Sequence, residues 1–246
     1  MNSITVTNLF AWRGKTFVLH IPSLKLAAGK VLCVTGPNGS GKTTLIETLA
    51  GLVRPQTGTV LIGGTPVTND LRATKASIGF IPDDEDWFVK NLSAREYLKL
   101  LRSIYRDAGV TSDMEARADS LATVLHFTAQ DQPLERLSHG NKKKVQLIAG
   151  LMHKPAVIIV DELRNGLDPL AVMAAEDIMK AEARRGACIV AATHDLWWAQ
   201  RFADRILLLI DGRVLLDQST RSLLQQYGSL DKMFRNVIED TYATVI

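Results

Sequence analysis

The chain has 246 residues, of which 46% are hydrophobic and 22% are charged, and this composition is typical of a globular protein with a substantial core. Its formal net charge of +3 is too small, and its charges are too evenly spread, to favour a nucleic-acid-binding protein. The longest aliphatic run, Ile206 to Ile210, is far too short to span a bilayer, and the amino terminus lacks the layout of a signal peptide. We therefore expect a soluble protein whose membrane association would come through a partner.

The first two strands are expected at residues 3–9 and 17–26, because both segments alternate or are rich in strand-forming residues. A short apolar strand is expected at residues 31–35. Cys33 in that strand and Cys188 in a later apolar run are expected to be reduced core residues rather than a disulfide or a metal pair.

A glycine-rich loop follows the third strand and leads into a helix. Its glycines let backbone N–H groups approach phosphate oxygens, and the positive end of the helix points at the same place. Lys42 can reach the β- and γ-phosphates, and the Thr43 hydroxyl can ligate Mg²⁺. A glycine-rich turn without a ligand is the alternative, but the strand, loop and helix together predict a nucleotide triphosphate site. We assign to it Gly36, Pro37, Asn38, Gly39, Ser40, Gly41, Lys42, Thr43 and Thr44.

Three aromatic residues lie near the turn between the first two strands: Phe10, Trp12 and Phe17. A nucleotide base gains about 1–3 kcal/mol by stacking on an aromatic ring, and we expect Trp12 to supply that ring. Packing in the core or on an edge strand is the alternative for each of the three.

Residues 85 to about 153 are expected to form a helical insert between two α/β portions. The capping box Ser93 to Glu96 opens one helix, Ser112 to Glu115 opens a second, and a third follows Leu137 to Asn141. The basic run Lys142 to Lys144 is expected to be a solvated face, with modest attraction of phosphate as the alternative.

Two strand ends carry the residues predicted to do chemistry. The apolar run Val157 to Val160 predicts a buried parallel strand that ends in Asp161 and Glu162. Next to a phosphate loop, Asp161 can hold the hydration shell of Mg²⁺ opposite Thr43, and Glu162 can orient and polarise an attacking water. A solvated acidic turn is the alternative.

His194 follows the next apolar strand, which is expected at residues 188–192. A neutral imidazole there can form a hydrogen bond with the γ-phosphate and sense its loss, whereas a structural histidine is the alternative. A hairpin around Asp211 and Gly212 is expected to close the sheet, and residues 221–246 are expected to form a helical tail.

Over residues 1 to about 240, the order of these motifs resembles the nucleotide-binding subunit of ATP-binding-cassette (ABC) transporters. Residues 36–43 resemble the Walker A loop of that family and residues 157–162 its Walker B strand. The turn Leu137 to Asn141 resembles the family's signature, Asn165 to Asp168 its D-loop, and His194 its switch histidine.

The resemblance implies an α/β fold: a phosphate-loop ATPase core with a mainly parallel sheet, an antiparallel β-subdomain and an inserted helical subdomain, over residues 1–220. It implies ATP and Mg²⁺ as cofactors, with Glu162, His194 and Lys42 in catalysis. In the family, two copies stack head to tail, so Ser138 and Gly140 would bind the γ-phosphate of ATP held on the partner subunit. The ATPase partner could be an identical or a different chain.

An integral membrane permease subunit is the other implied partner, and no nucleic acid is expected. The chain would then be cytoplasmic and peripheral on the inner face of the cell membrane. Residues 228–234 resemble tails of subunits that serve simple bacterial exporters, so export is the expected direction. A soluble ABC ATPase acting on nucleic acid or ribosomes and a non-hydrolysing regulatory subunit are the alternatives.

Three segments depart from the family pattern. The usual Leu-Ser-Gly-Gly-Gln signature is Leu-Ser-His-Gly-Asn here, and Leu163 and Arg164 replace the usual Pro-Thr. Asp83 stands where the family usually has glutamine. As an anion it can meet Mg²⁺ or the attacking water but cannot donate a hydrogen bond, so we assign it to the metal, with Thr43 and Asp161.

Overall fold

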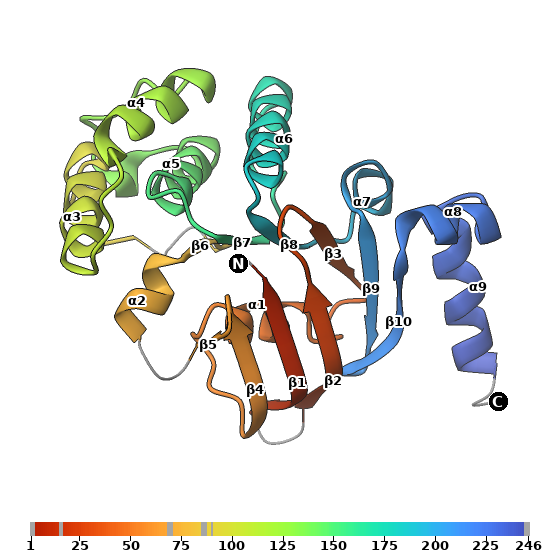
Figure 1. Cartoon of the computed structure of the whole chain (residues 1–246). Coiled ribbons are helices and arrows are strands. Elements are labelled where there is room, and N and C mark those ends of the chain that lie inside the picture. Colours follow the sequence, from red (N-terminus) through yellow and green to blue (C-terminus); the bar gives the residue numbers. More distant parts are fainter. Residues whose placement is uncertain (1–2, 15–16, 68–70, 85–87, 90, 244–246) are drawn as a thin grey trace.

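The computed structural model describes residues 3–14, 17–67, 71–84, 88–89 and 91–243 (Figure 1). Within these residues one mixed sheet has ten strands in the order β5-β4-β1-β2-β10-β9-β3-β8-β7-β6. The strands are β1 (Ile4–Arg13), β2 (Phe17–Leu26), β3 (Val31–Thr35), β4 (Thr57–Ile62), β5 (Thr65–Pro66), β6 (Ile78–Ile81), β7 (Val157–Asp161), β8 (Cys188–Ala192), β9 (Arg205–Ile210) and β10 (Arg213–Ser219).

The helices in the same part of the chain are α1 (Lys42–Leu49), α2 (Leu71–Ala76), α3 (Ala94–Asp107), α4 (Met114–Val124), α5 (His139–Leu151), α6 (Pro169–Arg184), α7 (Leu196–Phe202), α8 (Thr220–Tyr227) and α9 (Leu230–Ala243). A 3₁₀ turn spans Leu134–Arg136. None of the described helices is long and apolar enough to cross a bilayer.

The sheet consists of two parts with different strand directions. Strands β6, β7, β8, β3 and β9 pair in parallel, whereas β1, β2, β4 and β5 pair antiparallel. Strand β10 joins the two parts, because it pairs with β9 over most of its length but with β2 only through Arg213 and His20. The expected α/β fold, with its mainly parallel core and its antiparallel β-subdomain, is confirmed.

Alternation along the parallel strands explains where the helices pack. In β3, Val31 and Cys33 face one core cluster, and Leu32 and Val34 face the other. Helix α1 buries its apolar side in the second cluster, between the parallel strands and β1. The phosphate loop therefore lies where the two parts of the sheet meet. Both cysteines are buried in the core, as expected.

Helices α3, α4 and α5 gather beyond β6 (Figure 1) and pack against one another, as expected for the helical insert. The capping box of α3 is present, since Glu96 N donates to Ser93 Oγ and Ser93 N to Glu96 Oε2. The second helix begins one residue later than expected, because Asp113 rather than Ser112 accepts the N-capping bond from Ala116 N.

The carboxyl-terminal helices pack on the core. Leu223 of α8 and Leu230 and Met233 of α9 are buried, and Leu230 N donates to Gln200 Oε1 of α7 at 3.0 Å. Helix α7 itself was not predicted, although Asp195 caps it by accepting from Trp198 N at 2.8 Å.

Candidate functional site: a phosphate loop facing an acid pair

The loop between β3 and α1 has the backbone geometry of an anion cradle. Gly41, the N-cap of α1, has φ = 103°, and no side chain caps the helix. A Cβ on Gly36 would come within 2.1 Å of Leu209 O, so only glycine fits there. Because Gly41 has no side chain that could cap the helix, the first N–H groups of α1 can bind an anion.

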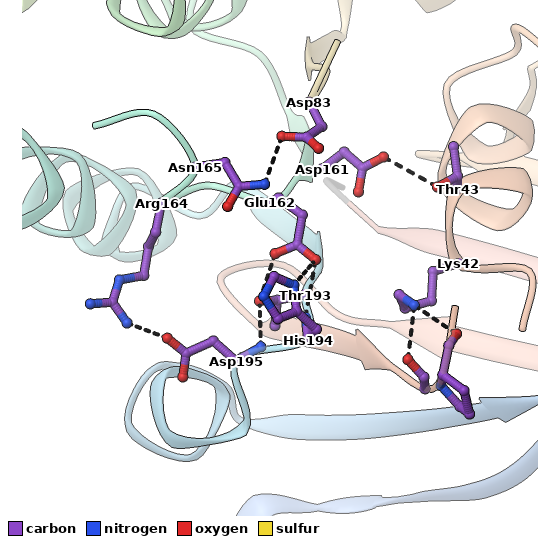
Figure 2. A network of polar contacts seen from close by, with 12 residues as sticks. Lys42, Thr43, Asp83, Asp161, Glu162, Arg164, Asn165, Thr193, His194 and Asp195 are labelled. Atoms are coloured by element: carbon purple, nitrogen blue, oxygen red, sulfur yellow. Dashed lines mark hydrogen bonds and ion pairs between the residues drawn. The ribbon is translucent and has the colours of Figure 1, made fainter. Parts of the chain in front are cut away.

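The Lys42 ammonium lies over this loop. Its Nζ donates to Gly36 O at 2.8 Å and to Pro37 O at 3.0 Å (Figure 2). Burial lowers the pKa of Lys42, and the negative charges of Glu162 and Asp161 oppose that shift. The lysine thus carries a charge for which the loop provides only neutral carbonyl acceptors.

A cavity of about 540 Å³ opens above the loop. It brings most of the predicted site residues together from α1, β7 and the segment after β6. The lining residues are Phe17, Asn38, Gly39, Gly41, Lys42, Thr43, Thr44, Asp83, Asp161 and Glu162.

Thr43 and Asp161 bring two side-chain oxygens close together in the cavity. Thr43 Oγ1 lies 3.4 Å from Asp161 Oδ2. Burial raises the pKa of Asp161 to about 6, with further contributions from Asp83 and Glu162, so a cation there would favour the ionised form. A hydroxyl and a carboxylate are the donors that Mg²⁺ prefers, so the donor chemistry fits. No described group of three acidic, histidine or cysteine side chains could hold a metal alone, so phosphate and water oxygens would have to complete the coordination.

Glu162 and His194 lie together at the ends of β7 and β8. His194 Nδ1 lies 2.7 Å from Glu162 Oε1, which also accepts from His194 N at 3.1 Å. Thr193 Oγ1 donates to Glu162 Oε2 at 3.0 Å (Figure 2). Sequence reasoning missed Thr193, although its place beside His194 was a usable signal.

Two of the positions that depart from the family pattern make polar contacts near the cavity. Asp83 Oδ1 accepts a hydrogen bond from Asn165 Nδ2 at 3.0 Å, which links the segment after β6 to the loop after β7. Arg164 forms an ion pair with Asp195 (Figure 2). Asn165 was not predicted as a site residue, and nothing in its local sequence indicates that Asp83 would be its partner.

The basic run at the start of α5 corrects one expectation. The solvated face predicted for Lys142 to Lys144 is wrong for two of the three residues, because Lys143 is 1% exposed and Lys144 is 7% exposed. Lys143 Nζ donates to Pro82 O at 2.8 Å and to Asp161 O at 3.0 Å, and Lys144 pairs with Asp168. The strand ends and the D-loop cover this side of α5.

The signature-like turn lies away from the cavity over the phosphate loop. Ser138 caps α5 by accepting from Asn141 N at 3.4 Å, and neither Ser138 nor Gly140 lines that cavity. The turn packs closely on the loop after β7, since a Cβ on Gly140 would lie 2.7 Å from Gly166 O. Within a single chain, the two predicted phosphate-binding segments are therefore separate.

The three aromatic candidates have different surroundings. Trp12 is 52% exposed, Phe10 stacks on His20 with ring centroids 4.1 Å apart, and Phe17 lines the cavity beside Gly41. Trp12 thus has a free face, and Phe17 is the aromatic nearest the phosphate loop.

Comparison with known proteins places this arrangement in a family. A family model described as ABC transporter matches residues 19–165. A protein of Halobacterium salinarum that carries the provisional name of an ABC transporter ATP-binding protein is 34% identical over 215 residues, covering 87% of this chain and 91% of that protein. The cobalt import ATP-binding protein CbiO of Rhodobacter capsulatus is 31% identical over 227 residues, covering 90% of this chain and 80% of CbiO.

Longer ABC transporter proteins and solved ABC cassettes also match this chain. ABC transporter A family member 8 of Arabidopsis thaliana is 30% identical over 208 residues, but the chain spans 23% of that protein. A solved ATP binding subunit of an ABC transporter matches with a TM-score of 0.87 at 26% identity, covering 96% of this chain and 99% of that chain. The dimeric bacterial ABC transporter cassette MJ0796 matches with a TM-score of 0.76 at 25% identity, covering 89% and 99%. From the phosphate loop, the acid pair and these matches, the chain belongs to the ABC transporter family and carries its ATP-binding domain.

Proposed function

We propose that the chain is an ATP-hydrolysing subunit that dimerises around two ATP molecules and powers a membrane permease. The observation that carries the proposal is the placement of Lys42 and Thr43 opposite Asp161 and Glu162 across one cavity. A triphosphate on the loop would have its γ-phosphate between the lysine and the acid pair.

The residues then have distinct roles. Lys42 exchanges the carbonyls of Gly36 and Pro37 for phosphate oxygens, and the N-terminal N–H groups of α1 bind the same anion. Thr43 and Asp161 would hold Mg²⁺, with Asp83 as a further acceptor, and the bound ion would supply positive charge against the phosphate oxygens. Glu162 accepts a hydrogen bond from the attacking water and orients it for in-line attack.

His194 supports the same step in this proposal. Its imidazole and its main-chain N–H both hold Glu162 Oε1, so the carboxylate has a fixed orientation before nucleotide binds. When the γ-phosphate is present, the imidazole can turn from Glu162 to a phosphate oxygen and so report whether hydrolysis has occurred.

A second ATPase subunit would complete each site. Ser138 is exposed and remote from the loop of its own chain, so its helix N-terminus is available to a γ-phosphate bound on a partner. Leu170, Met173 and Trp197 are 68%, 63% and 55% exposed. Met173 and Trp197 border a hollow of about 670 Å³ that Glu162 and His194 also line. A partner seated there would cover the apolar side chains and exclude water from the acid pair.

A permease would dock beside the Asp83 segment. Val89, Leu100 and Ile104 are exposed apolar residues, and Phe88 contacts Tyr97 of α3 edge-on at 5.3 Å. Because Tyr97, Leu100 and Ile104 follow helical spacing, they form one face of α3. An apolar helix of the permease fits this face, which would hold the chain on the cytoplasmic side of the membrane.

The tail resemblance favours export for this transport. The relatives include the cobalt import ATP-binding protein CbiO and the phosphonates import ATP-binding protein PhnC 1 of Haloquadratum walsbyi, so importers share the same kind of cassette. Uptake or extrusion in vesicles that contain the chain with its copurified permease distinguishes the two directions.

Glu162→Gln tests the function directly. The amide keeps the shape but is a far weaker base, so turnover should fall at least about 100-fold, while ATP binds and traps a dimer detectable by light scattering. Glu115→Gln, the same change on the exposed side of α4, should hydrolyse ATP normally and remain in the wild-type monomer–dimer equilibrium.

Two results would contradict the proposal. Normal phosphate release by Glu162→Gln would remove Glu162 from the reaction. Tight ATP binding without phosphate release by the wild type, alone or with its permease, would favour a regulatory subunit instead.

A further inference from the structure

Lys143 occupies an unusual place for a lysine. It is 1% exposed, and its Nζ bridges two main-chain carbonyls, Pro82 O at 2.8 Å and Asp161 O at 3.0 Å. These carbonyls lie at the ends of the neighbouring parallel strands β6 and β7, immediately before Asp83 and Glu162. One ammonium group therefore fixes the two segments that carry the acidic side chains of the cavity.

The local structure disfavours a cation at this position. Lys143 belongs to the amino-terminal part of α5, where the helix dipole is positive, and no acidic residue lies in the first turn. A buried lysine is also rare unless it is paired. Helix formation and core packing alone would favour an apolar side chain, so the reason for the lysine lies outside the helix.

Three carboxylates near the Lys143 ammonium account for a lysine at this position. Burial lowers the pKa of Lys143 to about 8, while Asp83, Asp161 and Glu162 each raise it. The positive charge of Lys143 in turn lowers the pKa of Asp161. Three acids and one ammonium thus share a partly buried site.

Gln146 provides an internal comparison. It lies one turn further along the same side of α5, and its Nε2 donates to Asp84 O at 2.6 Å. It therefore holds the same segment after β6 but carries no charge. Lys143 and Gln146 both attach the segment after β6 to α5. Of the two, Lys143 alone brings a positive charge to the acidic side chains.

We propose that Lys143 is a positioning residue of the ATP site: an internal counter-cation that holds Asp83 and Asp161 in place and offsets their charge, so that an anionic nucleotide can enter. The inference depends on the proposed ATP site. It also links the signature turn to the acid pair of the same chain, because Ser138 and Lys143 are on one helix.

The test compares nucleotide affinity with and without metal. A fluorescent ATP analogue is titrated at pH 7 into wild type, Lys143→Met, Lys143→Gln, Lys143→Arg and Gln146→Met, once with excess Mg²⁺ and once with EDTA. Loss of the ammonium leaves the acids uncompensated, so metal-free nucleotide should be repelled more than the Mg²⁺ complex. For Lys143→Met, the ratio of the dissociation constant measured with EDTA to that measured with Mg²⁺ should rise about tenfold. Its kcat should fall about tenfold.

The other variants separate charge from structure. Lys143→Gln retains donors without charge, so it should show the same raised ratio and provides the test if Lys143→Met does not fold. Lys143→Arg should restore the ratio to within about twofold of wild type. Gln146→Met should lower the unfolding temperature with an unchanged ratio.

An unchanged ratio in both uncharged variants would overturn the inference, as would an equal rise in Gln146→Met. These outcomes differ from failure of the proposed function, in which wild type itself would bind no nucleotide or would bind ATP without releasing phosphate.

Discussion

The imidazole of His194 and the carboxylate of Glu162 are in direct contact, with Nδ1 2.7 Å from Oε1. The hydrogen bond requires a proton on Nδ1, so in the neutral ring Nε2 is an acceptor. A turn of the ring, or its protonation, must precede any hydrogen bond from Nε2 to a phosphate oxygen. Glu162 and His194 therefore act as a coupled pair.

His194→Ala should lower kcat about 100-fold while the affinity for ATP changes less than about threefold, because the imidazole acts on the γ-phosphate and Glu162 rather than on the whole nucleotide. Thr193→Val removes one donor to Glu162 Oε2 and should lower kcat only about fivefold. Steady-state phosphate release and equilibrium ATP titration measure the two quantities. Equal losses in both variants would mean that the histidine only orients Glu162.

Trp12→Ala should weaken ATP binding about 5- to 150-fold and leave binding of inorganic tripolyphosphate unchanged, because the proposed stacking involves the base alone. Phe10→Ala is the control, since the Phe10 ring is already stacked on His20. Competition titrations with the two ligands measure the difference. A base-specific loss in Phe17→Ala, with none in Trp12→Ala, would assign the stacking to Phe17.

Acid stability should depend on His153, which is buried between Tyr105 and β6. Burial lowers its pKa from 6.5 to about 4, so the unfolded chain binds the proton first as the pH falls. The free energy of unfolding should therefore decrease by up to about 3 kcal/mol between pH 6.5 and pH 4.

His153→Gln keeps a donor for Ile78 O and should remove most of that decrease, as measured by urea unfolding across the pH range. Asp161 acts in the opposite direction, because its pKa is raised to about 6, but it is common to both proteins and cancels in their difference. If the unfolding free energies of wild type and His153→Gln fell equally between pH 6.5 and pH 4, His153 would not be the cause of the decrease.

Arg117→Met should cost about 2 kcal/mol of unfolding free energy, because it breaks a buried ion pair between α4 and Glu182 of α6 and a hydrogen bond to Leu151 O. Arg95→Met breaks the exposed pair with Asp131 and should lower the unfolding free energy much less, because solvent screens that pair. Urea unfolding of both variants measures the contrast. Equal costs would show that the α4–α6 pair contributes no more than a surface contact.

The phosphate loop, the acid pair and the capping box of α3 were predictable because each depends on residues close together in the chain. The burial of Lys143 was not, because the side of α5 that becomes covered depends on strand ends contributed by Pro82 and Asp161. The contact between Asp83 and Asn165 joins segments 82 positions apart, and no local pattern records such a pairing. Helix α7 was missed because it is short, although its cap at Asp195 was visible.

Glu162 has φ = 47°, a left-handed conformation that L-residues with side chains rarely adopt and that glycine adopts freely. The backbone at this position is therefore strained by roughly 1–3 kcal/mol. Glu162→Gly should relieve the strain and yield a more heat-resistant protein that cannot turn over ATP. Selection for stability alone would favour glycine at this position, and the proposed role of Glu162 in hydrolysis accounts for the glutamate.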